Sequence, residues 1–293
     1  WFRGKALMAI QKWASMKDLK LAERLASSSK VEERILASRI APRVGKTSKI
    51  ILKKLSKDTD HLVKQNAWKV RLHQDELLIK EAIENEETGV RILAVEIIEK
   101  MKHIDDEIII KILKDESSRI RKKAVSILRV HPELNSSGQY DEIIIDIAEN
   151  DKNAQIDAII MLIESGRESG VIREKIPIWL EQENPQMVKS IIHSLKDKKW
   201  SEMENLTKAI INSSNDKLIS GILRRNNTIE ANELRKEILI DEKRSNVLRA
   251  RIIEDLFGKK QKDEVLIKII TDLQNSESES ISNSAQMFMK SIE

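Results

Sequence analysis

Apolar residues recur along the chain at the spacing that places them on one side of an α-helix. The clearest copies of this pattern are Val90-Arg91-Ile92-Leu93-Ala94-Val95 and Ile120-Arg121-Lys122-Lys123-Ala124-Val125, which lie 30 residues apart. Both read apolar, basic, any, any, Ala, Val. Apolar positions at i, i+4, i+5 and i+8 form one stripe on a helix, so each copy predicts an amphipathic helix with one buried face.

Looser copies of the pattern extend over nearly the whole chain. Taking the first apolar residue of each copy as its anchor, the anchors are Val31, Val63, Val90, Ile120, Ala154, Met187, Leu218, Leu248 and Ile281. Their spacing averages about 31 residues, which is typical of repeat architectures. The fifth position of several copies is alanine, as at Ala67, Ala94, Ala124 and Ala158, and a side chain this small lets a neighbouring helix approach closely.

A second helical stretch with the same period lies between successive anchors. These stretches are residues 50–55, 77–83, 108–113, 143–147, 171–180, 206–211, 234–240 and 265–273. Short polar residues that can cap helices stand at the joints, namely Asp60, Thr88, Ser118, Asn153 and Asn184. Each repeat is therefore predicted to be a helical hairpin, and the anchor marks its second helix.

A lone hairpin cannot bury both of its apolar faces, whereas stacked hairpins enclose a continuous core. The sequence therefore predicts an all-α fold, an α-α superhelix or solenoid of about nine hairpins that occupies residues 1–293 as a single domain. Because glycine, proline and aromatic residues are scarce, composition also disfavours a sheet protein. The chain begins at Trp1 without methionine, and we expect it to be a fragment of a longer protein.

The anchors and the turns before them resemble the HEAT and HEAT-like (armadillo-type) helical repeat family. The resemblance rests on Glu86-Glu87-Thr88-Gly89-Val90-Arg91, on Asp115-Glu116-Ser117-Ser118 before Ile120-Arg121, and on Asn184-Pro185 before Val188. Pro177 is similar to the proline that often kinks a first helix in the family. The resemblance implies a curved rod that binds proteins, less often nucleic acids, through its concave face, and it leaves the HEAT and armadillo subclasses both open.

Charge is distributed unevenly along the chain. Residues 1–130 carry 29 basic and 19 acidic residues, a net of +10, whereas the remainder carries 23 and 29, a net of −6. The candidate binding residues are the basic ones on the second helices of the first half: Lys64, Lys69, Arg71, Arg91, Arg121, Lys122, Lys123 and Arg129. The family resemblance would place them on the inner face, where they could attract an acidic protein or a phosphate backbone.

Two other interpretations of these basic residues remain open. The residue after the anchor, as in Lys64, Arg91 and Arg121, can instead bond the acidic turn of a neighbouring repeat. The remaining lysines can simply belong to a solvated helix face. Aromatic stacking platforms for single-stranded nucleic acid are scarce. Trp68 is predicted to lie in the core, and the tryptophans near helix ends, Trp13, Trp179 and Trp200, are predicted to pack against the fold.

Motifs for catalysis and cofactors are missing from the sequence. The five histidines are scattered without an i, i+4 pair, cysteine is absent, and no glycine-rich phosphate loop occurs. The longest apolar run, residues 158–163, is too short to cross a bilayer. We therefore predict no catalysis, although some HEAT-like proteins are DNA glycosylases or bilin lyases, and we predict no cofactor, no metal and no membrane contact.

The function predicted from the sequence is that of a binding scaffold for a protein partner, acidic in character. The alternative is a nucleic-acid-binding module that uses the basic groove of the first half. An intracellular, cytoplasmic location suits a chain without cysteine. The oligomeric state stays open.

Overall fold

The protein is all-helical wherever the structure describes regular secondary structure. The computed structural model describes residues 2–45, 48–167, 170–181, 189, 191, 204–259 and 261–292, and these form 18 α-helices and no strand. The prediction of an all-α fold is thereby confirmed. Contacts divide the chain into two compact units, Trp1–Leu134 (unit 1) and Asn135–Glu293 (unit 2), and each unit is considered by itself.

Unit 1 is built from helical hairpins. Its α-helices are α1 (Phe2–Trp13), α2 (Leu19–Ala26), α3 (Val31–Ile40), α4 (Ser48–Leu55), α5 (His61–Gln74), α6 (Ile79–Ile83), α7 (Thr88–Ile98), α8 (Asp106–Leu113) and α9 (Ser118–Val130). Short 3-10 turns lie at Met16–Asp18, Ala41–Arg43, Glu76–Leu78 and Pro132–Asn135. Within each hairpin α2 packs on α3, α4 on α5, α6 on α7 and α8 on α9.

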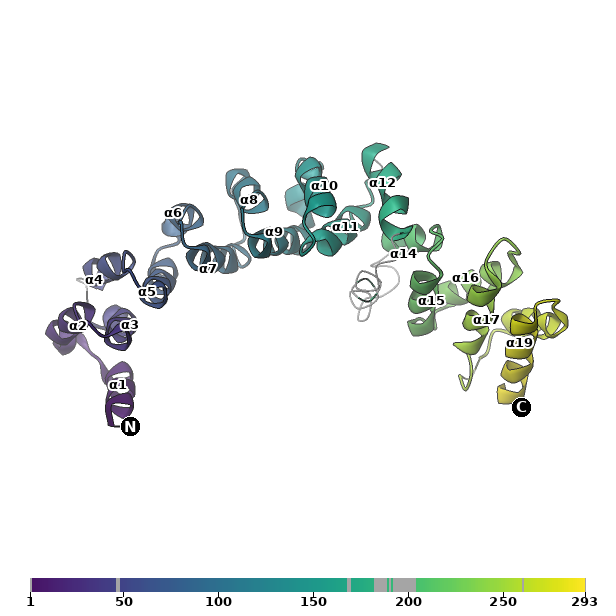
Figure 1. The fold of residues 1–293 in the computed structure, drawn as a ribbon, viewed down its shortest axis with the longest axis horizontal. Helices are drawn as coiled ribbons and strands as arrows, with labels where there is room; N and C mark the ends of the chain where they lie inside the picture. The colour runs from purple at the N-terminus through teal and green to yellow at the C-terminus, as the bar shows by residue number, and fades with distance from the viewer. Residues whose placement is uncertain are drawn as a thin grey trace. The chain divides into compact units, whose positions relative to one another are not determined.

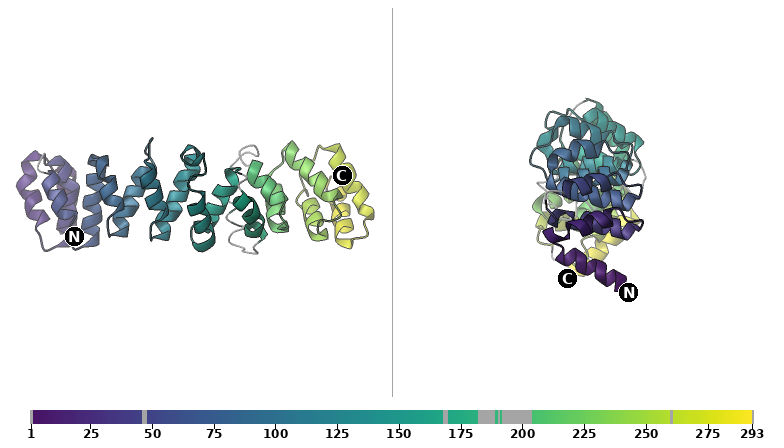
Figure 2. Two further views of the ribbon diagram at one scale, coloured as in Figure 1. Left: turned by 90° about the horizontal axis from the view of Figure 1, so that it is seen from above. Right: turned by 90° about the vertical axis from the view of Figure 1, so that its left-hand side faces the viewer.

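The second helices of unit 1 also pack on one another in chain order. Helix α3 contacts α5, α5 contacts α7, and α7 contacts α9, which makes a continuous row. Helices α4, α6 and α8 lie on one side of that row (Figure 1). Seen from above, the helices of this unit lie side by side (Figure 2). Neighbouring hairpins therefore share their buried faces, as the period of the sequence predicts.

Unit 2 repeats the same pairing. Its α-helices are α10 (Asp141–Asn150), α11 (Gln155–Glu164), α12 (Gly170–Glu181), α14 (Glu204–Ile211), α15 (Asp216–Arg225), α16 (Ile229–Ile240), α17 (Asn246–Glu254), α18 (Glu264–Asp272) and α19 (Glu279–Ile292), with a 3-10 turn at Leu273–Asn275. The hairpin contacts are α10 with α11, α14 with α15, α16 with α17, and α18 with α19. Helices α15, α17 and α19 pack in sequence. Pro177 lies inside α12, the helix predicted to hold it.

The predicted second helices agree well with the structure. Val63, Val90 and Ile120 lie in α5, α7 and α9 and are fully buried, as are Leu218, Leu248 and Ile281 in unit 2. All eight predicted first-helix stretches coincide with described helices. Met187 lies outside the described residues.

The predicted helix caps are mostly wrong by one or two positions. Asp60 is the N-cap of α5, as predicted, and its carboxylate accepts the backbone N–H groups of Leu62 and Val63. Thr88 and Ser118 are instead the first residues of α7 and α9, and Asn153 precedes the true cap position of α11. The reason is that Asn85, Asp115 and Asp151, which lie earlier in these turns, each accept the backbone N–H two residues further on. Asn184 lies outside the described residues.

The core of both units is aliphatic and is assembled around small residues. Four alanines of unit 1, Ala37, Ala67, Ala94 and Ala124, are completely buried at equivalent positions of α3, α5, α7 and α9. A methyl group at this position lets the axes of adjacent second helices come close, which a branched side chain would prevent. The buried alanines thus determine how closely adjacent second helices pack.

Candidate functional site: the second-helix face of unit 1

Each second helix of unit 1 is preceded by a turn that a polar side chain organises. Ser28, Asp58, Asn85 and Asp115 each accept the backbone N–H two residues further on, at 2.8 to 3.1 Å. Such local bonds are the reason that Ser, Asp and Asn favour turns over helix interiors. A cation stands six residues after each turn residue, at Arg34, Lys64, Arg91 and Arg121.

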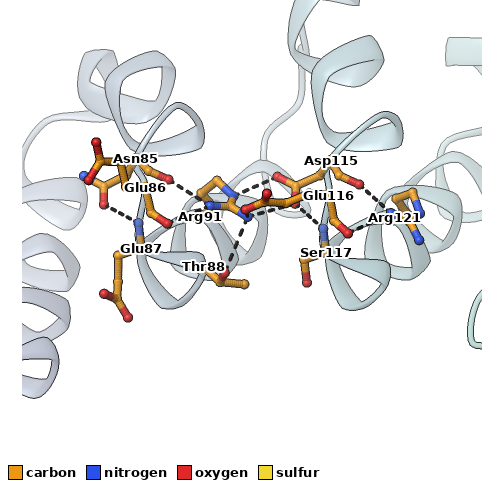
Figure 3. Close-up of polar contacts among 9 residues, drawn as sticks. All are labelled: Asn85, Glu86, Glu87, Thr88, Arg91, Asp115, Glu116, Ser117 and Arg121. Carbon is orange, nitrogen blue, oxygen red and sulfur yellow. Dashed lines mark hydrogen bonds and ion pairs between the residues drawn. The ribbon is translucent and has the colours of Figure 1, made fainter.

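Arg91 is the most completely bonded member of this cation series. It reaches back to its own turn, where Nη1 donates to the carbonyls of Asn85 at 2.9 Å and Glu86 at 3.1 Å (Figure 3). It also reaches forward to the next turn, where Nε donates to Asp115 Oδ2 at 2.8 Å and Nη2 to Asp115 Oδ1 at 3.1 Å. Nη2 further bonds Glu116 at 2.8 Å.

This double engagement removes Arg91 from the accessible surface. Its side chain is 7% exposed and that of Asp115 is 8% exposed. The hydrogen bonds that Arg91 donates to Asp115 raise the pKa of Arg91 above its ordinary value. A buried guanidinium needs this number of acceptors, because desolvation costs several kcal/mol per unpaired ion. The interpretation of Arg91 as a bridge to the acidic turn of the next repeat is confirmed.

An equivalent bridge that the sequence analysis missed joins Arg34 to Asp58. Arg34 Nε donates to Asp58 Oδ2 at 2.8 Å, and its Nη1 donates to the Ser28 carbonyl at 3.0 Å. The anchor chosen for this repeat, Val31, lies two residues too early, since the turn bonds and Ala37 place Glu33 at the position of Val90. The signal that could have found it is the separation of 24 residues between arginine and aspartate, shared with Arg91 and Asp115.

The other two cations of the series, Lys64 and Arg121, have different contacts. The turn residue that follows Lys64 is the neutral Asn85, and Lys64 Nζ lies 3.9 Å from Glu87 instead. Arg121 donates to the carbonyls of Asp115 at 2.6 Å and Glu116 at 3.0 Å, within its own turn. We refer to the Arg34–Asp58 and Arg91–Asp115 pairs as the two rungs of unit 1.

Arg71 also serves the fold. Its guanidinium lies over the ring of Trp68, 4.2 Å from the centroid, and Nη1 donates to Ser56 Oγ at 2.9 Å. Nη2 lies 3.5 Å from Glu81. Trp68 itself is 2% exposed, which confirms its prediction as a core residue. A cation held against a buried aromatic face contributes to packing more than to ligand binding.

The remaining basic residues of the candidate site are solvent-accessible to different degrees. Lys69 and Lys122 are exposed, whereas Lys123 and Arg129 are half-buried. Lys123 Nζ lies 3.9 Å from Glu96 on the preceding second helix. The sequence analysis missed Arg119, an exposed residue one turn before Lys122 and Lys123 on α9.

Acidic residues are almost excluded from this row of helices. Helices α5, α7 and α9 together hold nine basic residues and one acid, Glu96. Helices α5 and α9 hold no acid at all. The acids of this part of the chain lie in the turns, where Asp58, Asp115 and Glu116 bond the cations described above. The solvent-accessible surface of α5, α7 and α9, which we call the second-helix face, therefore carries more basic than acidic residues.

The middle of the second-helix face, on α7, holds apolar residues around a single acid, Glu96. Ile92, Leu93 and Ile97 on α7 are only half-buried, and α7 packs between α5 and α9. The face thus places an apolar strip between two acid-free helices. Such a surface can bind an anionic ligand that also carries apolar groups.

The packing predicted for the other tryptophans is found at one of the two that the structure describes. Trp179 in unit 2 is 3% exposed, in agreement with its predicted packing role. Trp13 was predicted to pack as well, and this is wrong: it is 74% exposed at the end of α1, where the Lys12 ammonium lies 5.2 Å from the centroid of its ring. Trp200 lies outside the described residues.

No protein-family model matches the chain, and no curated protein matches it in sequence. Across the described part of the chain, no three His, Asp or Glu side chains gather where a metal ion could be held. None of the described helices has both the length and the apolar character that a bilayer crossing requires. Function must therefore be argued from the geometry of the chain itself.

Proposed function

We propose that the chain is a HEAT-like α-α superhelix that serves as a scaffold, and that its second-helix face binds a protein partner rich in acidic residues. Support for the architecture comes from hairpins that stack second helix on second helix in both units. Support for the binding role comes from the second-helix face. No reacting group is assigned to it. A reducing compartment such as the cytoplasm suits this cysteine-free chain.

The observation that carries this proposal is the segregation of charge on unit 1. The acids are used in the turns, while α5 and α9 present cations without acids on either side of the apolar strip of α7. Randomly solvated helix faces would mix both signs, as the first helix α8 does with Asp106, Glu107 and Lys111. A protein segment that alternates acidic and apolar side chains matches the face in both charge and polarity.

Nucleic acid is the second candidate, because the same cations could contact phosphates. The described helices of the second-helix face offer no exposed tryptophan, tyrosine or phenylalanine ring on which bases could stack, since Trp68 is buried. Half-buried Ile92, Leu93 and Ile97 would gain nothing from a phosphate backbone. These features favour a protein ligand over a nucleic acid.

Charge reversal on the face tests the proposal. The double variant Lys69→Glu/Lys122→Glu is compared with Lys49→Glu/Lys53→Glu, which makes the same change in net charge on the first helix α4. Partners captured from nuclease-treated extract are crosslinked to the bait, and the crosslinks are mapped. We expect crosslinks on α5, α7 and α9 with the parent and the α4 variant, and their loss with the face variant.

Binding to nucleic acid is measured with the same three proteins. A duplex and a single-stranded RNA of equal length are titrated over a range of salt concentrations. Binding whose log affinity falls linearly with log salt, and that disappears only in the face variant, would replace the protein partner by nucleic acid. Crosslinks spread equally over first helices would contradict both assignments of the face.

A further inference from the structure

A hollow lies in unit 2 between the loops of two adjacent hairpins. It has a volume of about 480 Å³ and is formed by the loop between α15 and α16 together with the loop between α17 and α18. Its polar lining includes Asn232, Lys259, Lys262 and Asp263, and its apolar lining includes Ile229 and Leu256. This volume is sufficient for a small organic molecule.

Positive charge accumulates behind this hollow. Arg235 is 1% exposed, and its Nη1 donates at 2.7 Å to Asn232, a lining residue. Its Nη2 donates to the carbonyls of Leu223 and Asn226 at the end of α15. Arg235 Nε is buried without an acceptor among the described residues. No carboxylate in the described chain lies within ion-pair distance of this guanidinium.

Lys259 extends the positive charge to the wall of the hollow. Its Nζ donates to the Arg224 carbonyl at 3.0 Å, which uses one of the three N–H groups of an ammonium. Burial lowers the pKa of Lys259, and the nearby Arg235 lowers it further, while Asp255 only partly opposes this shift. A cation in this situation is incompletely compensated, so an anion close to it would stabilise it.

The acids near the hollow already have other partners. Asp263 Oδ1 accepts the backbone N–H of Leu266 at 3.0 Å, and its Oδ2 lies 3.4 Å from Lys236 Nζ. Asp255 Oδ1 lies 3.5 Å from Nε of Arg224. A third acid, Glu233, lies 2.7 Å from Lys236 Nζ. Three acids therefore stand against five cations, Arg224, Arg235, Lys236, Lys259 and Lys262, which leaves an excess of cations around the hollow.

We propose that this hollow binds a small phosphate monoester, with the phosphate near Lys259 and Lys262 and the organic group against Ile229 and Leu256. The phosphate adds negative charge beside the buried Arg235 and the half-buried Lys259. The apolar wall gives the organic part of the ligand a contact that inorganic phosphate cannot make. The site is independent of the second-helix face of unit 1.

Titration of the full chain with phenyl phosphate and with inorganic phosphate, at matched ionic strength, tests the proposal. We expect saturable binding of both by calorimetry, tighter for phenyl phosphate, and a rise in the pKa of Lys259 in the complex, followed by NMR of its labelled ammonium. Lys259→Gln should weaken binding about tenfold, the loss of one charge-assisted contact. Lys217→Gln, an exposed lysine on α15, is the matched control and should bind as the parent does.

Three results would overturn the proposal. They are the absence of saturable binding of either probe, equal binding by parent and Lys259→Gln, and equal weakening by Lys217→Gln. A second variant, Lys262→Glu, guards against misfolding of the first, because the Lys262 side chain is exposed. If Lys262→Glu folds and still binds phenyl phosphate as the parent does, the assignment of the phosphate to this hollow is wrong.

Discussion

Arg91 and Asp115 form a two-bonded ion pair across the boundary between two repeats, with Nε 2.8 Å from Oδ2 and Nη2 3.1 Å from Oδ1. Arg34 and Asp58 repeat this geometry at 2.8 and 3.1 Å. One repeat boundary, that of Lys64 and Asn85, lies between the two pairs. Each aspartate also holds the turn of its own repeat through a backbone N–H. One side chain therefore fixes a turn and at the same time ties it to the preceding hairpin.

Removal of the Arg91 side chain is expected to destabilise unit 1 strongly. Arg91→Ala leaves Asp115 buried without its cation and frees the carbonyls of Asn85 and Glu86, and breaking a buried pair in this way costs about 3 kcal/mol. Denaturant unfolding followed by helical circular dichroism would measure the loss. Arg119→Ala, on the exposed side of α9, is the control and should change stability by less than about 0.5 kcal/mol. Similar stabilities for the two variants would contradict the role given to the rung.

The weak position between the two rungs can be strengthened. Lys64→Arg combined with Asn85→Asp supplies the planar guanidinium and the carboxylate that the other boundaries have. We expect the double variant to gain about 1 kcal/mol over the parent, because bidentate pairs are stronger than a lysine contact at 3.9 Å. The single variants serve as controls in a double-mutant cycle. A coupling energy of zero between the two substitutions would show that the positions do not meet.

The buried alanines should not tolerate larger side chains. Ala94→Leu inserts three carbon atoms between α7 and its neighbours at a position with no exposed surface, and overpacking of this kind costs about 1 to 3 kcal/mol. This loss of stability should appear as faster hydrogen exchange of the backbone amides in α5, α7 and α9. Leu62→Ala, a change of equal size at an exposed position of α5, should leave exchange rates unaltered.

Acid should weaken unit 2 through Asp263. The backbone N–H of Leu266 lowers the pKa of Asp263, and Lys236 lowers it further. Because the folded-state pKa lies below the unfolded value of about 3.9, the carboxylate stabilises the fold above that pH and loses this contribution as pH falls through the folded-state pKa. Asp263→Asn keeps the helix cap and removes only the charge. Its stability deficit at neutral pH should shrink in acid, whereas exposed Glu264→Gln should show no such deficit.

The sequence predicted the helices better than it predicted the roles of their charged residues. Apolar period depends on burial alone, so Val63, Val90 and Ile120 could be assigned to buried positions without knowing any partner. Arg91 and Lys69 look alike in the sequence, and only the position of Asp115 in three dimensions separates a buried bridge from an exposed cation. Val31 was misplaced because Glu33, a charged residue, stands where the other repeats have an apolar anchor.

Both rungs are made from parts that belong to adjacent repeats only, and this has a consequence for how such a chain can change in length. Excision of residues 85–114 would bring the turn of Asp115 directly after α6, opposite Lys64, so that a cation would again face an acid. Whole repeats can therefore be deleted or duplicated without stranding a buried charge, whereas a deletion of half a repeat would strand one.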